Sequence, residues 1–219
     1  MTGAMQLVIG NKNYSSWSLR PWLVMQHFGI AFEEVRVNLR APDRKAQILA
    51  HSAAGTVPAL KQQDLIIGDS LAICEYLGDL HPDKGLWPRD LRARAVARAI
   101  SAEMHSGFAP LRAHCPMDMI ARTPMSNLPD DVGSNVTRIV EIWKNCRKEF
   151  GAGGDMLFGE FSIADAMYAP VASRFRTYVP DLSQYGDDGT AQAYVEAVHS
   201  LPAIERWIEE GRREIVQYG

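Results

Sequence analysis

Residues 14–22 read Tyr14-Ser15-Ser16-Trp17-Ser18-Leu19-Arg20-Pro21-Trp22, and this segment decides how the rest of the chain is interpreted. It is followed by Val57-Pro58-Ala59-Leu60 and by Asp69-Ser70-Leu71-Ala72. The first segment joins the end of a strand to a helix start through clustered hydroxyls. The second opens a strand with a proline, and the third opens a helix with an acid and a serine. All three lie in one stretch of alternating strands and helices.

Working outward, the first half predicts the order β-α-β-α-β-β-α. Strands are expected at 7–9 and at 35–39, where apolar and polar residues alternate. Helical spacing of apolar residues between them ends at Gly29. A hairpin is expected with arms at 57–61 and 65–67, and the next helix ends before Pro82.

The second half shows no convincing strand. Prolines and a glycine at 81–90 indicate a domain boundary. Helices are expected over 91–114 (up to Pro110), along an apolar stripe at 136–150, and over 163–178, 189–200 and 203–216, with a loop at 116–129. The sequence therefore predicts an α/β domain (5–82), a linker (83–90) and an all-helical domain (91–219). Ser162 and Asp165 have the spacing of a capping box, for which we expect a structural role only.

Composition limits the classes of function. Formal net charge is −3 over 219 residues with no block of like charge, which argues against a nucleic-acid partner. We recognise neither a signal peptide nor an apolar run of the ~20 residues that span a bilayer, so no membrane association is expected. Three cysteines without a Cys-x-x-Cys pair favour a reducing cytoplasm. Six scattered histidines predict no metal site.

The hydroxyl cluster suggests thiol chemistry. Pro21 has no N–H and fits the first turn of a helix, so the helix should begin near 17–19, just after Ser15 and Ser16. Amide donors and the positive end of the helix dipole favour an anion there. A serine hydroxyl can donate to a thiolate and lower the pKa of the bound thiol. The alternative is plain capping of the helix by Ser16 or Ser18.

The other two segments offer contacts for a peptide-like ligand. A cis bond before Pro58 would turn the Val57 backbone outward, although an edge-strand trans proline explains the same pattern. Ser70 could cap its helix or offer its hydroxyl and free amides to a ligand carboxylate, while Asp69 could hold an ammonium group.

In this order, the segments resemble the cytosolic glutathione transferases over essentially the whole chain: a thioredoxin-like domain followed by a helical domain. Ser15-Ser16-Trp17-Ser18-Leu19-Arg20 is similar to the Ser-Ser-Cys-Ser-x-Arg motif of the zeta class, and Ala102 to Phe108 is similar to an uncharacterised bacterial subgroup. The resemblance assigns thiolate activation to Ser15, with Ser16 as its neighbour. It assigns glutathione binding to Val57, Pro58, Asp69 and Ser70. Ser162 to Asp165 matches the family's capping box.

Three residues depart from the family pattern. Asp69 is shorter than the usual Glu or Gln. Trp17 replaces the zeta-type cysteine, which argues against isomerase chemistry. Thr56 stands where Lys or Gln often precedes Val-Pro, so Lys45 or His51 becomes a candidate anchor for the glycine carboxylate.

The resemblance implies a homodimeric transferase that uses glutathione, without a metal, against a small apolar electrophile. The expected electrophile site holds Trp17, Met104, His105, Phe108 and Arg176, and helix packing is the alternative for Met104 and Phe108. Two other functions stay open. One is a zeta-like isomerase of the maleylacetoacetate type, with Arg174 or Arg176 binding substrate acids. The other is a glutathione-binding protein without turnover.

Overall fold

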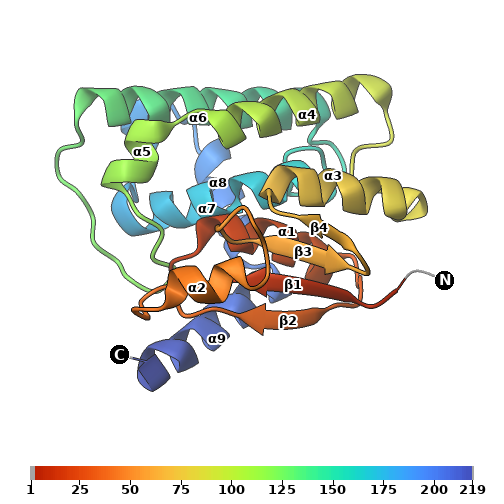
Figure 1. Cartoon of the computed structure of the whole chain (residues 1–219). Helices are drawn as coiled ribbons and strands as arrows, with labels where there is room; N and C mark the ends of the chain where they lie inside the picture. The colour runs from red at the N-terminus through yellow and green to blue at the C-terminus, as the bar shows by residue number, and fades with distance from the viewer. Residues whose placement is uncertain (1–2, 219) are drawn as a thin grey trace.

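A computed structural model describes residues 3–218. The first half contains β1 (Met5–Ile9), α1 (Ser16–His27), β2 (Glu33–Arg36), α2 (Arg44–Leu49), β3 (Ala59–Gln62), β4 (Leu65–Ile67) and α3 (Ser70–Leu80). The strands form one sheet in the order β2-β1-β3-β4, in which β1 is parallel to β2 and antiparallel to β3, and β3 is antiparallel to β4 (Figure 1). Leu7, Val8 and Ile9 are completely buried, as expected of a central strand covered on both faces.

The second half is helical. It contains α4 (Leu91–Ser106), α5 (Ala109–His114), α6 (Asp130–Phe150), α7 (Ile163–Tyr178), α8 (Thr190–His199) and α9 (Pro202–Tyr218). Short 3-10 turns lie at η1 (Pro82–Lys84) and η2 (Ser183–Tyr185). In Figure 1, α4 and α6 lie uppermost, α7 lies between them and the sheet, and α9 returns to the lower side of the first half. This architecture confirms the predicted fold class.

Helix α7 is the centre of the molecule. Almost all its residues are buried, and it packs against α1, α4 and α8, so both halves share one hydrophobic core. The predicted capping box is present: the backbone amide and the hydroxyl of Ser162 donate to the Asp165 carboxylate at 2.8 and 3.0 Å. Asp165 also accepts from Leu157 N and Tyr194 Oη at 2.9 and 3.1 Å, so this acid serves to hold the start of α7 in place.

Four element boundaries differ from the sequence predictions. Helix α1 begins at Ser16, not at 17–19, because the chain enters the helical turn five residues before Pro21. Strand β2 ends at Arg36, because its partner β1 ends at Ile9. Beyond this point the Leu39 amide donates to the Asn11 side chain at 2.8 Å and not to a strand.

The other two differences concern helix ends. The helix expected over 91–114 splits at Gly107 and Phe108, where Phe108 adopts a left-handed conformation with φ of 56°. Pro110 therefore lies in the first turn of α5 instead of ending a long helix. Helix α3 is capped by Asp69 and not by Ser70.

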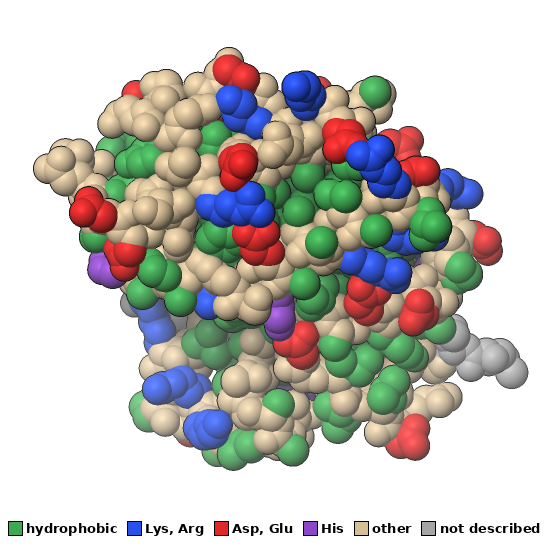
Figure 2. Space-filling view, turned by 90° about the horizontal axis from the view of Figure 1, so that it is seen from above, with side chains coloured by type: hydrophobic (Ala, Val, Ile, Leu, Met, Phe, Trp, Pro, Cys, Tyr) green, Lys and Arg blue, Asp and Glu red, His purple; other side chains and the backbone are tan. Residues whose placement is uncertain are grey.

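The remaining global findings concern charge, membranes and metals. Figure 2 shows acidic and basic side chains intermixed on the face that carries α4 and α6, without an extended basic area there. Among residues 3–218, no helix combines the length and hydropathy needed to cross a bilayer. Within the same part of the chain, no three His, Cys, Asp or Glu side chains are grouped as metal ligands.

Candidate functional site

The three segments that decided the sequence interpretation meet at one cavity of about 260 Å³. Its lining combines the start of α1, the turn before β3, the start of α3 and one residue of α4: Trp17, Thr56, Val57, Pro58, Gly68, Asp69, Ser70 and His105. Since α4 belongs to the helical half, both halves contribute to this cavity.

The start of α1 carries linked hydroxyls. Ser15 is the N-cap residue, but its side chain makes no capping bond. The Ser15 and Ser18 hydroxyl oxygens lie 2.7 Å apart and share a hydrogen bond, and the Gly10 amide donates to Ser18 Oγ at 3.1 Å. Ser15 and Ser16 are only 6% and 8% exposed and are not part of the lining, although they directly precede the lining residue Trp17 in the sequence. Among the described residues, the amides of Trp17 and Ser18 find no acceptor, so the helix start retains donors for an anion.

The turn before β3 carries a cis peptide bond between Val57 and Pro58, one of the two alternatives for this pattern. The ladder with β1 begins at Ala59, so the Val57 backbone lies beyond the paired part of the strand. No described residue hydrogen-bonds to the Val57 amide or carbonyl. The backbone of Val57 is therefore available to a ligand in the cavity.

Asp69 and Ser70 have different roles. The Asp69 carboxylate accepts from the Leu71 and Ala72 amides at 3.0 and 2.9 Å and thereby caps α3. Its second oxygen lies 3.1 Å from His105 Nε2, which joins the two halves across the cavity. Ser70 is 2% exposed, and its hydroxyl has no hydrogen-bond partner. The Ser70 hydroxyl can therefore donate to a polar group in the cavity.

Trp17 contacts the ring of His105 and lies close to two guanidinium groups. Its ring meets the edge of His105 at 5.3 Å between centroids, and the guanidinium groups of Arg20 and Arg112 lie 4.0 and 5.5 Å from its centroid. Arg20 is fully buried and donates to the carbonyls of Met167 and Ser16, while its Nη2 has no partner.

A third guanidinium group, that of Arg174, interacts electrostatically with Arg20. Burial, together with the charges of Arg174 and Arg112, holds the pKa of Arg20 well below its usual value. Burial and the charge of Arg112 lower the pKa of Arg174 to about 10. Within the described part of the chain, none of these three residues forms a salt bridge. We call Arg20, Arg112 and Arg174 the arginine cluster.

Besides Ser15 and Ser16, five candidate residues do not line this cavity. Met104 is completely buried and Phe108 is 9% exposed, and both pack in the core, the alternative stated for them. Arg176 lines a separate cavity of about 490 Å³ with Glu196 and His199. Lys45 is exposed and donates to the Gly55 carbonyl at 3.3 Å, and the candidate anchor His51 is also outside the lining.

The grouping of the arginines was missed from the sequence. Arg20 belongs to the 14–22 segment, and Arg174 was considered only as an alternative to Arg176. Arg112 lies on the short helix α5, whose boundaries no sequence pattern indicated. The three residues come from α1, α5 and α7, so only the tertiary structure brings their charges together.

Comparison with known proteins identifies the family of the chain. The sequence profile of the "Glutathione S-transferase, N-terminal domain" matches residues 14–80, and that of the "Glutathione S-transferase, C-terminal domain" matches residues 94–210. The chain belongs to the glutathione S-transferase family.

Similar proteins within this family include zeta-type members. A "Probable maleylacetoacetate isomerase" of Caenorhabditis elegans is 29% identical over 193 residues, covering 86% of each chain. "Glutathione S-transferase Z2" of Arabidopsis thaliana is 24% identical over 209 residues, covering 91% of each chain. Among solved structures, a glutathione transferase homolog from Burkholderia with bound glutathione aligns with a TM-score of 0.71 at 21% identity, covering 96% of this chain and 98% of that one. The chain thus shares its fold with remote members of the family.

Proposed function

We propose that this glutathione S-transferase binds glutathione in the 260 Å³ cavity. The observation that carries the proposal is the buried Ser70 hydroxyl, which has no partner within the protein and lies in the same lining as the unpaired Val57 backbone. The γ-glutamyl carboxylate would accept from Ser70 and the first amides of α3, and the cysteinyl backbone would pair with Val57. Asp69, at the same helix start, would attract the γ-glutamyl ammonium group. The glycine carboxylate would lie toward Thr56.

The thiolate would then be stabilised at the start of α1. In the structure the Ser15 hydroxyl donates to Ser18, which also accepts from the Gly10 amide. Rotation of both hydroxyl hydrogens would reverse the first bond, so that Ser18 donates to Ser15 and the Ser15 hydroxyl donates to sulfur. Ser16 and the unpaired amides of Trp17 and Ser18 add donors and the positive helix end. A pKa of the bound thiol near 6.5 instead of 8.5 corresponds to about 2.7 kcal/mol of anion stabilisation.

A second substrate would approach from the Trp17 and His105 side of the cavity, where the two halves meet. The exposed part of the Trp17 ring suits a small apolar electrophile. Rate would come from the stabilised thiolate and from holding sulfur next to the electrophilic carbon. Met104, Phe108 and Arg176 have no part in this proposal because they do not reach the cavity.

The arginine cluster favours a second candidate function, isomerisation of a substrate that carries carboxylates. None of the three guanidinium groups lines the cavity itself, and Arg20 and Arg174 are buried, so their contribution would be the positive charge that they place behind Trp17. The thiolate would add to its double bond, the resulting single bond would rotate, and elimination would return glutathione unchanged. The zeta-type relatives support this candidate, and the bulky Trp17 in place of cysteine opposes it.

One set of assays tests the proposal. Calorimetric titration of the purified protein with glutathione should give saturable binding, and Ser70→Ala should weaken it. Turnover is then measured with glutathione and a chlorodinitroarene, a peroxide or maleylacetone. Conjugation supports the transferase, and turnover of maleylacetone alone supports the isomerase. Binding without turnover of any substrate would leave a glutathione-binding protein, and absence of binding would contradict the proposal.

We also expect a homodimer of about twice the 24.3 kDa chain mass. Leu65 and Ile66 are 41% and 48% exposed on the edge strand β4, a feature that proteins usually cover. Light scattering at micromolar protein measures the mass, and Ile66→Lys should shift it toward the monomer. A wild-type monomer that persists on concentration would contradict the dimer.

A further inference from the structure

His105 occupies part of the proposed glutathione site in the structure. It belongs to the last turn of α4, in the helical half, whereas Asp69 caps α3 in the first half. Both residues line the 260 Å³ cavity, and His105 Nε2 lies 3.1 Å from Asp69 Oδ2. An N–H at Nε2 can donate to this oxygen whether the imidazole is neutral or protonated. A side chain of the protein therefore already binds the carboxylate that the ammonium group of glutathione would approach.

The two oxygens of the Asp69 carboxylate have different partners. Oδ1 accepts from the Leu71 and Ala72 amides, which fixes the orientation of the group at the start of α3. Since each carboxylate oxygen has two lone pairs, Oδ1 is fully used. Oδ2 is the oxygen that remains for other donors, and among the described residues its partner is His105. An ammonium group that approaches Asp69 therefore meets the imidazole of His105 at the same oxygen.

Few contacts hold the imidazole of His105 in this position. Its ring meets the Trp17 ring edge-on at 5.3 Å between centroids. Its Nδ1 is buried and has no hydrogen-bond partner among the residues that the structure describes, so the bond to Asp69 is the polar contact that displacement of the ring would break. The side chains of His105 and Asp69 are 30% and 50% exposed, which keeps the strength of this contact modest.

The size of the cavity agrees with a side chain that must move. Sites for small molecules usually measure about 300–1,000 Å³. With His105 bound to Asp69, the cavity measures about 260 Å³, just below that range. Displacement of the imidazole would therefore enlarge the cavity and free the Asp69 oxygen in one movement.

We propose that His105 is a specificity-determining residue that competes with the ammonium group of glutathione for Asp69, an inference that rests on the glutathione site proposed above. Glutathione would displace the imidazole from Oδ2 when it binds. The attraction between the ammonium group and Asp69 is then partly offset by the loss of the bond to His105. The site would therefore distinguish glutathione only weakly from an otherwise identical thiol that lacks the amino group, and it would accept both classes of thiol.

Calorimetric titration with two thiols tests this competition. One is glutathione, and the other is N-glutaryl-cysteinylglycine, which is glutathione without its amino group (the deamino thiol). His105→Ala removes the competing donor and should lower the dissociation constant of glutathione ~5-fold, while that of the deamino thiol should stay within twofold of wild type. His105→Gln retains an N–H of similar reach and should restore the wild-type affinity for glutathione. His105→Leu replaces His105→Ala if that variant melts early.

A double-mutant cycle locates the effect at Asp69. Asp69→Asn keeps an oxygen that can cap α3 but removes the negative charge, so it should weaken glutathione binding. Adding His105→Ala to Asp69→Asn should then change the dissociation constant by less than twofold, because the carboxylate for which the two groups compete is absent. An undiminished ~5-fold gain in the Asp69→Asn background would overturn the proposal.

Three further results separate this inference from the glutathione site itself. Weaker or unchanged glutathione binding by His105→Ala would overturn the competition, because His105 would then contact the ligand or play no part in binding. An equal gain for the deamino thiol would overturn it as well, since the gain would come from added space. A wild-type protein that binds neither thiol would contradict the glutathione site, whereas glutathione binding that is insensitive to His105 would contradict the competition alone.

Discussion

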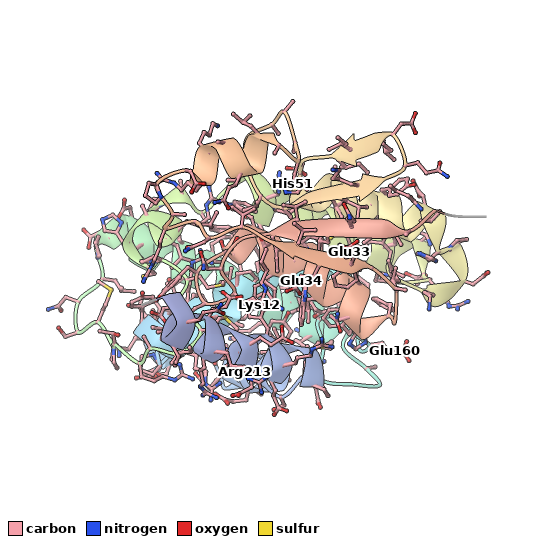
Figure 3. The ribbon with its side chains drawn as sticks, turned by 60° about the horizontal axis from the view of Figure 1, so that its bottom comes forward. Lys12, Glu33, Glu34, His51, Glu160 and Arg213 are labelled. Atoms are coloured by element: carbon pink, nitrogen blue, oxygen red, sulfur yellow. The ribbon has the colours of Figure 1, made fainter. Side chains whose placement is uncertain are left out.

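Lys12 and Arg20 lie eight residues apart, and both side chains are completely buried. Their charges differ in their partners, because only Lys12 is paired with carboxylates. The Lys12 ammonium contacts Glu34 at 2.7 Å and also pairs with Glu210. It lies 4.6 and 5.2 Å from the ring centroids of Trp22 and Trp207. Figure 3 shows Lys12 between the first half of the chain and α9, with Glu34 beside it. Lys12 is thus a neutralised charge that fastens α9 to the rest of the protein.

Among residues 3–218, Arg20 makes no salt bridge to a carboxylate. It is held by two backbone carbonyls, stacks on Trp17 and shares its surroundings with the charges of Arg174 and Arg112. Burying a charge without a counter-charge lowers the stability of the folded protein. Such a cluster is therefore a candidate for a functional role. The buried basic residues of this protein therefore fall into two kinds, those paired with carboxylates and those without such a partner. Lys12 is paired with two carboxylates, whereas the arginine cluster forms no salt bridge within the described residues, and we propose that it favours an anionic substrate.

The largest effect is expected on the free energy of unfolding when the Lys12 cation is removed. Lys12→Met leaves Glu34 and Glu210 without their cation, which should cost about 3–5 kcal/mol in the free energy of unfolding. Urea denaturation measures this loss. The matched control is Arg213→Gln, since Arg213 pairs with Glu209 while 74% exposed and should change stability by less than about 1 kcal/mol. Equal effects of the two changes would contradict a structural role for Lys12.

The cluster should respond in the opposite way. Arg112 is half-buried and is the accessible member, so Arg112→Met should leave the melting temperature close to wild type. If the second substrate carries a carboxylate, its KM should rise ~10-fold, about 1.4 kcal/mol of lost pairing. The control is an uncharged chloroarene, whose KM should not change. An equal rise in KM for both substrates would show that Arg112 only supports Trp17.

A smaller effect is expected at Ser70. Its hydroxyl makes no bond within the protein, and Asp69 provides the cap of α3, so Ser70→Ala should not lower the melting temperature. The glutathione KM should rise ~5-fold, about 1 kcal/mol for one hydrogen bond, while kcat changes little. Steady-state kinetics with glutathione varied provide the measurement. An unchanged KM in folded protein would remove Ser70 from the site.

The sequence predicted features that depend on neighbouring residues. The capping box at Ser162 and Asp165 depends on spacing within one turn, and the apolar stripe of α6 on helical periodicity. The three segments at 14–22, 57–60 and 69–72 came together because each ends or begins an element at the same edge of the fold.

Features set by tertiary packing were not predictable in this way. Arg176 lies two residues beyond Arg174 on α7, and a difference of two residues on a helix turns the side chain to another face. Its place in a separate cavity with His199 depends on how α8 and α9 pack. Lys12 carried no motif at all, because its partners Glu34 and Glu210 are 22 and 198 residues away.

We propose that the start of α1 stabilises the glutathione thiolate, and titration of the bound thiol measures this stabilisation. The ultraviolet absorbance of the thiolate is followed against pH for glutathione bound to the wild type, Ser15→Ala and Ser16→Ala. We predict a thiol pKa near 6.5 in the wild type and a rise toward 8.5 in Ser15→Ala, with turnover at least ~10-fold lower. Loss in Ser16→Ala instead would move the role by one residue, and normal values in both variants would assign it to the backbone amides. A bound thiol that titrates near 8.5 in the wild type would contradict the claim.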